Sequence, residues 1–307
     1  VLNFKIMMMK RSIYILIMLG FMSCKGYLDI KPDIRMDVPN TLADCELLLN
    51  DYGNLNMTSP VATLIAGEEF YLNAENWYNI TNLDDRNAYI WSDEQGLRGM
   101  GWQGPYRTVF LANQVLQVLD KLPVGEKNGA QYKQVLGKAL FFRAFAYHQL
   151  VQLYCVGYNE NTAGKEQGLP LKQTPDLATV EGRASLEATY GFILQDYSRA
   201  TALLAITAAA KSLPNRTAAF AGLARVYLDM QRYDAAFRYA DSAWRLQPRL
   251  MDFNLLDSHS ESPIPKNNEE VIFSALTPYS EALGSYYSRI NPSLMDLYKE
   301  GDLRRLI

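Results

Sequence analysis

Apolar residues recur at the three- and four-residue spacing of an α-helix along most of the chain between residues 102 and 246. This pattern predicts helices over residues 102–122, 130–154, 186–204, 217–230 and 234–246. The second of them is apolar on nearly all sides, as is typical of a helix packed between neighbours. Proline, which cannot continue a helix, follows the first and the last. The pattern therefore predicts a mainly α-helical fold of stacked helical hairpins.

A shorter apolar stripe precedes these helices. Thr41 is suited to cap the start of a helix, and Leu42, Cys45, Leu49 and Tyr52 fall on one helical face. A cysteine on such a face is expected to be a small core residue rather than a reactive thiol. The sequence thus predicts a further helix that carries Cys45 into the core.

Helical periodicity disappears between Gly53 and Gly101, where Asn, Asp, Tyr and Trp are abundant. We predict long irregular loops over this stretch. A loop region of this length within a compact chain is uncommon and often functional. It is therefore the first place to look for a ligand.

The same stretch carries the residue types that bind sugars. Trp and Tyr rings can stack on the C–H face of a sugar, while Asn, Asp and Arg hydrogen-bond its hydroxyl groups. The candidate ligand-binding residues are Asn76, Trp77, Tyr78, Arg86 and Trp91. Simple packing of Tyr89 and Trp91 onto the helices is at least as good an explanation of those two side chains. Asn neighbours on both sides indicate that Trp77 and Tyr78 are the more exposed pair.

The first residues have the organisation of a secretory signal. Lys10 and Arg11 precede an apolar run from Ile13 to Met22, which is shorter than the roughly 20 residues that span a bilayer. Ser23 and Cys24 follow, and a cysteine directly after a small residue is the signal for lipoprotein processing. The alternative is an ordinary signal peptide with a chance cysteine. We predict that Cys24 is acylated and that the lipid holds the protein on a membrane face.

These features divide the chain into three predicted parts. Residues 1–23 form a signal peptide, in which the residues before Met7–Met9 are explained by upstream translation or a misplaced start. Residues 24–40 form a lipid-anchored, extended tether punctuated by proline. Residues 41–307 form the helical domain.

Composition argues against several classes of function. The 307 residues carry a net charge of -3 with no block of like charge, which disfavours a nucleic-acid partner. Three cysteines and two histidines are too few for a disulfide framework or a multi-histidine metal centre. The sequence has no phosphate-binding glycine loop and no nucleophile elbow. We therefore expect neither an enzyme nor a cofactor.

Two groups of polar residues could be interpreted as catalytic but have simpler explanations. His148 lies in the apolar 130–154 segment, where a packed or hydrogen-bonded core histidine is expected. Asp84 and Asp85 are adjacent acids in the predicted loop region, where such side chains are usually solvated. Neither group changes the expectation of a binding protein.

The last predicted hairpin follows the tetratricopeptide pattern of large and small packing residues on two helices followed by proline. The matching positions are Phe220, Leu223, Ala224, Tyr227, Ala236, Ala243 and Pro248. Small residues in the second helix let two backbones approach closely. Ala240 departs from the bulky residue usual at its place.

Several short segments occur along the chain in an order that is characteristic of one protein family. They are Ser23-Cys24, Tyr27-Leu28-Asp29, Pro32, 136–151, Gly168-Leu169-Pro170-Leu171, Asp196 with Ala200, 213–219, 223–228, 268–273 and 302–305. Together they resemble the SusD/RagB family of outer-membrane nutrient-binding lipoproteins, over essentially the whole chain from Cys24. Members of that family typically continue well past this length, so the resemblance also implies a chain truncated at its C-terminus.

The resemblance implies a SusD-like α/α superhelix with a tetratricopeptide repeat, anchored by lipid in the outer membrane and facing the cell exterior. It implies capture of a glycan or oligosaccharide nutrient and its delivery to a TonB-dependent, SusC-like transporter. Two alternatives stay open. One is a peptide-binding, RagB-like uptake protein, and the other is a periplasm-facing tetratricopeptide scaffold.

Overall fold

A computed structural model describes residues 39–92 and 100–305, and the chain from Pro39 onward forms one compact unit. The predicted signal peptide, Cys24 and nearly all of the predicted tether lie outside the described residues. Within the described ranges, no helix is long and apolar enough to cross a membrane.

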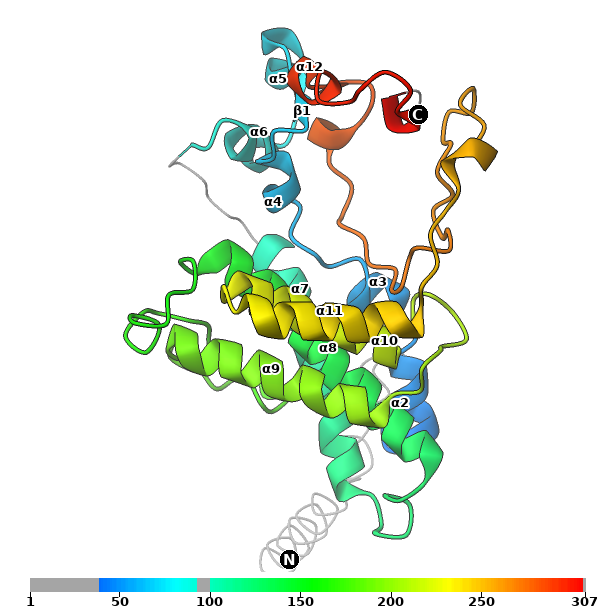
Figure 1. The fold of residues 1–307 in the computed structure, drawn as a ribbon. Helices are drawn as coiled ribbons and strands as arrows, with labels where there is room; N and C mark the ends of the chain where they lie inside the picture. The colour runs from blue at the N-terminus through cyan, green and yellow to red at the C-terminus, as the bar shows by residue number, and fades with distance from the viewer. Residues whose placement is uncertain (1–38, 93–99, 306–307) are drawn as a thin grey trace, which may run out of the picture. The chain divides into compact units, whose positions relative to one another are not determined.

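The main body consists of helices that pack in chain order (Figure 1). They are α7 (Met100–Lys121), α8 (Ala130–Tyr154), α9 (Leu186–Leu203), α10 (Arg216–Asp229) and α11 (Tyr233–Leu246), with the short α2 (Leu42–Leu48) against α7 and α8. Each of the longer helices begins and ends within two residues of its predicted bounds. The mainly helical fold of stacked hairpins is confirmed.

Side-chain caps explain why several boundaries were legible in the sequence. The Ser185 hydroxyl accepts a hydrogen bond from the Ala188 amide at 3.1 Å and begins α9. Thr41 forms a capping box with Asp44 at the start of α2. Such caps satisfy amide groups that the first turn of a helix leaves without a partner.

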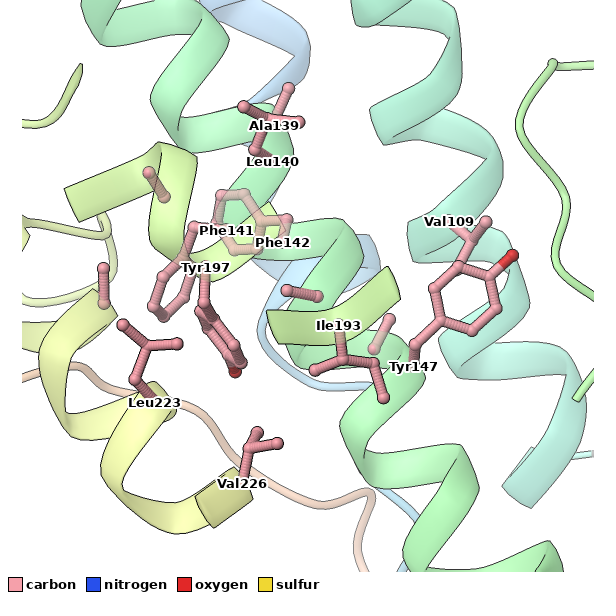
Figure 2. Close-up of a cluster of buried hydrophobic side chains, with 14 of the residues drawn as sticks. Val109, Ala139, Leu140, Phe141, Phe142, Tyr147, Ile193, Tyr197, Leu223 and Val226 are labelled. Carbon is pink, nitrogen blue, oxygen red and sulfur yellow. The ribbon is translucent and has the colours of Figure 1, made fainter. Parts of the chain in front are cut away.

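The hydrophobic core lies where α8 is enclosed by α7, α9 and α10 (Figure 2). Phe142 and Tyr147 of α8 are fully buried there, and Tyr197 of α9 packs edge-on to Phe141 with 5.5 Å between ring centroids. A Cβ at Gly222 of α10 would lie 2.6 Å from the Tyr197 ring. The absence of a side chain at this position lets α10 approach α9 closely.

One buried ion pair crosses this core. Arg143 of α8 donates to both carboxylate oxygens of Asp196 of α9, at 2.7 and 2.9 Å, and to the Asn113 side chain of α7 at 2.9 Å. Its guanidinium also lies 4.7 Å from the Phe192 ring centroid. Since all these groups are buried or nearly so, the network fixes the register of three helices.

The last hairpin packs as the tetratricopeptide pattern predicts. Ala236 and Ala243 of α11 are buried against α10, which allows the close approach of the two backbones. The Tyr227 ring of α10 stacks on Tyr239 of α11 with 5.4 Å between centroids.

The described part of the stretch predicted as irregular loops, up to residue 92, instead contains short elements. These are α3 (Tyr52–Leu55), α4 (Ala62–Ile65), β1 (Phe70–Tyr71), α5 (Ala74–Asn79) and α6 (Leu83–Tyr89). The helices are too short to show a period, and two of the Asn residues that suggested loops are N-caps, as is Asp51 just before the stretch. Asp51, Asn73 and Asn82 each accept a hydrogen bond from a first-turn amide.

A satellite lobe, which we define as residues 61–92 and 280–291, has its own small core. Ile65, Leu72, Ile80 and Ala88 bury together with Ala282 of the short η3 (Glu281–Leu283). Strand β1 pairs antiparallel with β2 (Arg289–Ile290), with Phe70 opposite Ile290. The remaining described elements are η2 (Phe253–Leu255), α12 (Pro292–Met295) and η4 (Leu303–Arg305). Two segments far apart in sequence therefore fold as one lobe (Figure 1).

Candidate functional site

Three of the five predicted ligand residues come together in the satellite lobe. The Arg86 guanidinium of α6 lies 4.5 Å from the ring centroid of Trp77 and 5.3 Å from that of Tyr78, both on α5. The indole of Trp77 also donates a hydrogen bond to the Arg86 carbonyl at 3.0 Å. We call these three side chains the aromatic platform.

The members of the platform differ in exposure. Tyr78 is 71% exposed, as predicted. Trp77 is half-buried, contrary to the prediction, because its ring packs against the satellite core and beneath Arg86. Tyr78 therefore presents the free aromatic face, and Trp77 supports the arginine from behind.

Arg86 is held in place without a charged partner. Within the described residues it forms no ion pair, and its Nε atom is buried without a hydrogen-bond partner. Cation–π contacts with two rings fix the guanidinium plane but use none of its N–H groups. Because Nε is buried, the two terminal NH2 groups are the donors that can bind hydroxyl or carboxylate oxygens of a ligand.

The other two predicted residues lie outside this contact set. Asn76 donates to the Tyr287 carbonyl at 2.6 Å, so its amide ties α5 to the C-terminal part of the lobe. Trp91 is 72% exposed just after α6, with a left-handed φ of 54°. Trp91 does not pack as the alternative explanation held, whereas Tyr89 does pack, but within the satellite lobe rather than onto the long helices: its hydroxyl accepts from the Leu72 amide at 2.8 Å.

The adjacent acids need a correction. Asp85 is buried rather than solvated, and its carboxylate accepts from the Ser280 hydroxyl at 2.6 Å and from the Asn82 amide at 3.1 Å. Burial raises the pKa of this carboxyl group above its usual value, although the Ser280 hydrogen bond opposes the shift. Asp85 lies on α6, so its role is to join α6 to Ser280 on the other half of the lobe.

A second feature could not be found from the sequence. A cavity of about 680 Å³ lies between α8, α10 and residues 270–277, and we call it the helical cavity. Its walls carry Phe145, His148 and Gln149 of α8, Arg225 of α10 and Phe273. These residues come from distant parts of the chain and form no motif, so only the fold reveals their proximity.

His148 is a core histidine, as predicted. It is 1% exposed, and its Nε2 lies 2.7 Å from an Asp229 oxygen that also accepts from Gln152 at 2.8 Å. Burial lowers the pKa of His148, although Asp229 opposes the shift. No cluster of His, Cys, Asp and Glu in the described ranges could hold a metal ion.

One comparison with known proteins identifies a family. A model of the SusD-like family, described as starch-binding and associating with the outer membrane, matches residues 26–228. A comparison with curated proteins finds no match.

Solved structures share the fold at low identity. A sugar-binding protein described as putative from Bacteroides vulgatus is 22% identical, with a TM-score of 0.59 over 68% of this chain and 47% of that one. A SusD-like carbohydrate-binding protein from Bacteroides vulgatus is 21% identical, with a TM-score of 0.65 over 87% and 60%. A laminarin-binding SusD-like protein is 16% identical, with a TM-score of 0.52 over 72% and 49%. The chain thus spans about half the length of these structures and shares their fold.

Proposed function

Because the chain belongs to the SusD-like family of starch-binding proteins that associate with the outer membrane, we propose that it captures a glycan nutrient at the cell surface and passes it to a TonB-dependent, SusC-like transporter. The family match confirms the resemblance noted in the sequence. It is a match to binding proteins rather than to enzymes, in agreement with the lack of catalytic motifs. Acylation of Cys24 supplies the membrane anchor in this proposal.

The aromatic platform supports glycan capture most directly. Tyr78 offers an exposed ring for stacking on the C–H face of a sugar, and the neighbouring Arg86 offers unpaired N–H donors to its hydroxyl groups. A stacking surface beside fixed polar groups is the usual composition of a sugar site. Trp91, which is also exposed, follows the helix that carries Arg86 and is proposed to extend the surface.

The substitution Tyr78→Ala tests the platform. We expect it to weaken glycan binding at least about tenfold, or ~1.4 kcal/mol, because the stacking face is lost. Affinity electrophoresis in laminarin and in soluble starch measures the effect. The matched control is Tyr233→Ala on α11, where the ring is 64% exposed outside the satellite lobe. Equal retardation of both variants and the parent protein contradicts a glycan site at Tyr78.

A peptide ligand is the competing proposal, and one observation favours it. Arg86 forms no ion pair within the described residues, and a guanidinium binds a peptide carboxylate more strongly than a neutral sugar hydroxyl, because both partners are charged. Parallel glycan and peptide arrays separate the two classes. If the protein captures only peptides, and Arg86→Ala abolishes this binding, the glycan assignment is overturned. The proposed role in nutrient uptake would remain.

Delivery to a transporter is tested in the outer membrane itself. Pull-down of the tagged protein from gently solubilised outer membranes is expected to recover a TonB-dependent transporter. Protease treatment of intact cells is expected to cleave the protein, since the proposal places it outside. Protection from protease would favour the periplasm-facing scaffold instead.

A further inference from the structure

The helical cavity contains a buried polar side chain that the fold leaves without a partner. Tyr197 is 1% exposed and lines the cavity, yet its hydroxyl has no hydrogen bond within the described residues. Figure 2 shows it between the aromatic side chains of α8 and Leu223 of α10. The Tyr197 oxygen is not among the side-chain atoms that are fully buried without a partner, so the hydroxyl is accessible from the cavity and can form a hydrogen bond with an occupant.

A single cation faces the same space. Arg225 of α10 lines the cavity and forms no ion pair within the described ranges. Its positive charge affects both buried groups. Burial raises the pKa of Tyr197, and the charge of Arg225 partly offsets that rise. Burial lowers the pKa of His148, and the charge of Arg225 lowers it further. All three residues line the same cavity, so one ligand there could contact each of them.

The lining also carries aromatic rings and a side-chain amide. Phe145 and Phe273 meet edge-on with 5.5 Å between ring centroids, and both border the cavity. Gln149, half-buried on α8, has no hydrogen bond within the described residues. The cavity therefore combines an apolar ring wall with unpaired donors and acceptors.

The charges of the lining indicate the class of ligand. Arg225 is balanced by Glu270 at the same cavity, and burial keeps His148 neutral near pH 7. With no net charge to compensate, the lining favours an uncharged ligand rich in hydroxyl groups. The volume of about 680 Å³ is within the range of roughly 300–1,000 Å³ that holds small ligands.

We propose that the helical cavity is a second binding site for a neutral oligosaccharide, separate from the aromatic platform. The platform would bind one oligosaccharide, and the cavity would bind another. In the cavity, Phe145 and Phe273 would stack on the sugar rings. Tyr197, Gln149 and Arg225 would form hydrogen bonds with the hydroxyl groups. This inference rests on the proposed function for its ligand class but not on the platform for its site.

Isothermal titration of the full chain with neutral oligosaccharides tests the proposal. The probes are maltohexaose, cellohexaose, laminarihexaose and xylohexaose, with hexagalacturonate as the acidic comparison. The expected result is two equivalents of at least one neutral probe. The substitution Gln149→Trp, which fills the cavity with an indole, is expected to reduce the stoichiometry to one. The matched control is Gln117→Trp, at an exposed position of α7.

A second variant guards against misfolding of the first. Arg225→Gln, at an exposed residue, removes the charge but keeps a polar, hydrogen-bonding side chain, and it is expected to weaken the cavity site about tenfold. Tyr78→Ala is expected to leave one equivalent, which Gln149→Trp then removes.

The outcomes separate this inference from the proposed function. One equivalent that Tyr78→Ala removes and Gln149→Trp leaves intact supports the platform and overturns the cavity site. One equivalent with the opposite sensitivity supports the cavity and overturns the platform. Absence of binding by every probe overturns both, and preference of the cavity for hexagalacturonate overturns the neutral class.

Discussion

At the scale of single residues, the buried pair between Arg143 and Asp196 does most to specify how the helices meet. Both side chains lie in the core, so each depends on the other to compensate its charge. Neither residue was singled out for this role in the sequence, because Arg143 and Asp196 are 53 positions apart and resemble surface charges on two helices.

Replacing Arg143 with alanine is expected to lower the free energy of unfolding by about 3–5 kcal/mol, because Asp196 keeps a buried charge without compensation. Urea denaturation followed by circular dichroism measures the loss. The control is Arg245→Ala, which removes an exposed pair with Asp241 on α11 and is expected to cost less than about 0.5 kcal/mol. Similar losses in the two variants would contradict the stabilising role of the buried pair.

The buried histidine predicts a pH dependence. Burial holds the pKa of His148 below its ordinary value of 6.5, so below that pH the unfolded chain binds a proton that the folded protein resists. The free energy of unfolding should therefore fall as the pH drops from 7 to 5. His148→Gln is expected to flatten this slope, whereas His259→Gln, at a side chain that is 95% exposed, is the control. An unchanged slope in His148→Gln would refute the argument.

At the scale of elements, the aromatic platform depends on short helices that are stable only when capped. Asn73 begins α5, which carries Trp77 and Tyr78, by accepting from the Asn76 amide at 2.7 Å. A helix of this length contributes little stability by itself, so the cap and the lobe around it determine whether it forms.

Asn73→Ala is expected to destabilise α5 by about 1 kcal/mol and to weaken glycan binding, since the platform then spends less time ordered. Hydrogen exchange of the α5 amides and affinity electrophoresis measure the two effects. Asn73→Asp retains an oxygen that can cap the helix and is expected to behave like the parent protein. Faster exchange without weaker binding would separate the helix from the site.

The long helices could be predicted because their own residues determine them. The apolar pattern of α8 and the cap at Ser185 are local signals, and both led to correct boundaries. The satellite lobe could not be predicted, because asparagines such as Asn73 and Asn82 are as common in loops as at the starts of helices. The burial of Trp77 was missed for a related reason: it depends on Arg86, on another helix, and on a core completed by residues more than 190 positions later.

At the scale of the whole molecule, the proposed surface attachment would depend on Cys24, a residue outside the described ranges. Cys24→Ala is expected to release the protein from the membrane fraction, because the thiol that carries the proposed lipid is gone. Fractionation of cells with immunodetection measures this, and Cys155→Ser, at a half-buried position after α8, is the control. Sedimentation of Cys24→Ala with membranes would point to a different anchor.

The candidate sites differ in how much the sequence could reveal. Composition alone directed attention to the residues around Tyr78, because a local cluster of Trp, Tyr and Asn can be recognised in a sequence without knowledge of the fold. The cavity beside Tyr197 and Arg225 combines α8, α9, α10 and a segment without regular structure, so no local pattern marks it. The sequence also gave no sign that Tyr197 lacks a hydrogen-bond partner, which is a property of the packed core.

The satellite lobe is built from two segments that are far apart in the chain, and this has a consequence for synthesis of the protein. Its two halves meet through contacts such as that of Asn76 with Tyr287, which are 211 residues apart in the chain, whereas the stacked hairpins pair with near neighbours. Closing so long a loop is entropically costly and slow, so the hairpins can form while the ribosome is still translating. The first half of the lobe must wait for β2 to emerge. A nascent chain arrested before residue 289 would carry an ordered helical stack but no competent aromatic platform.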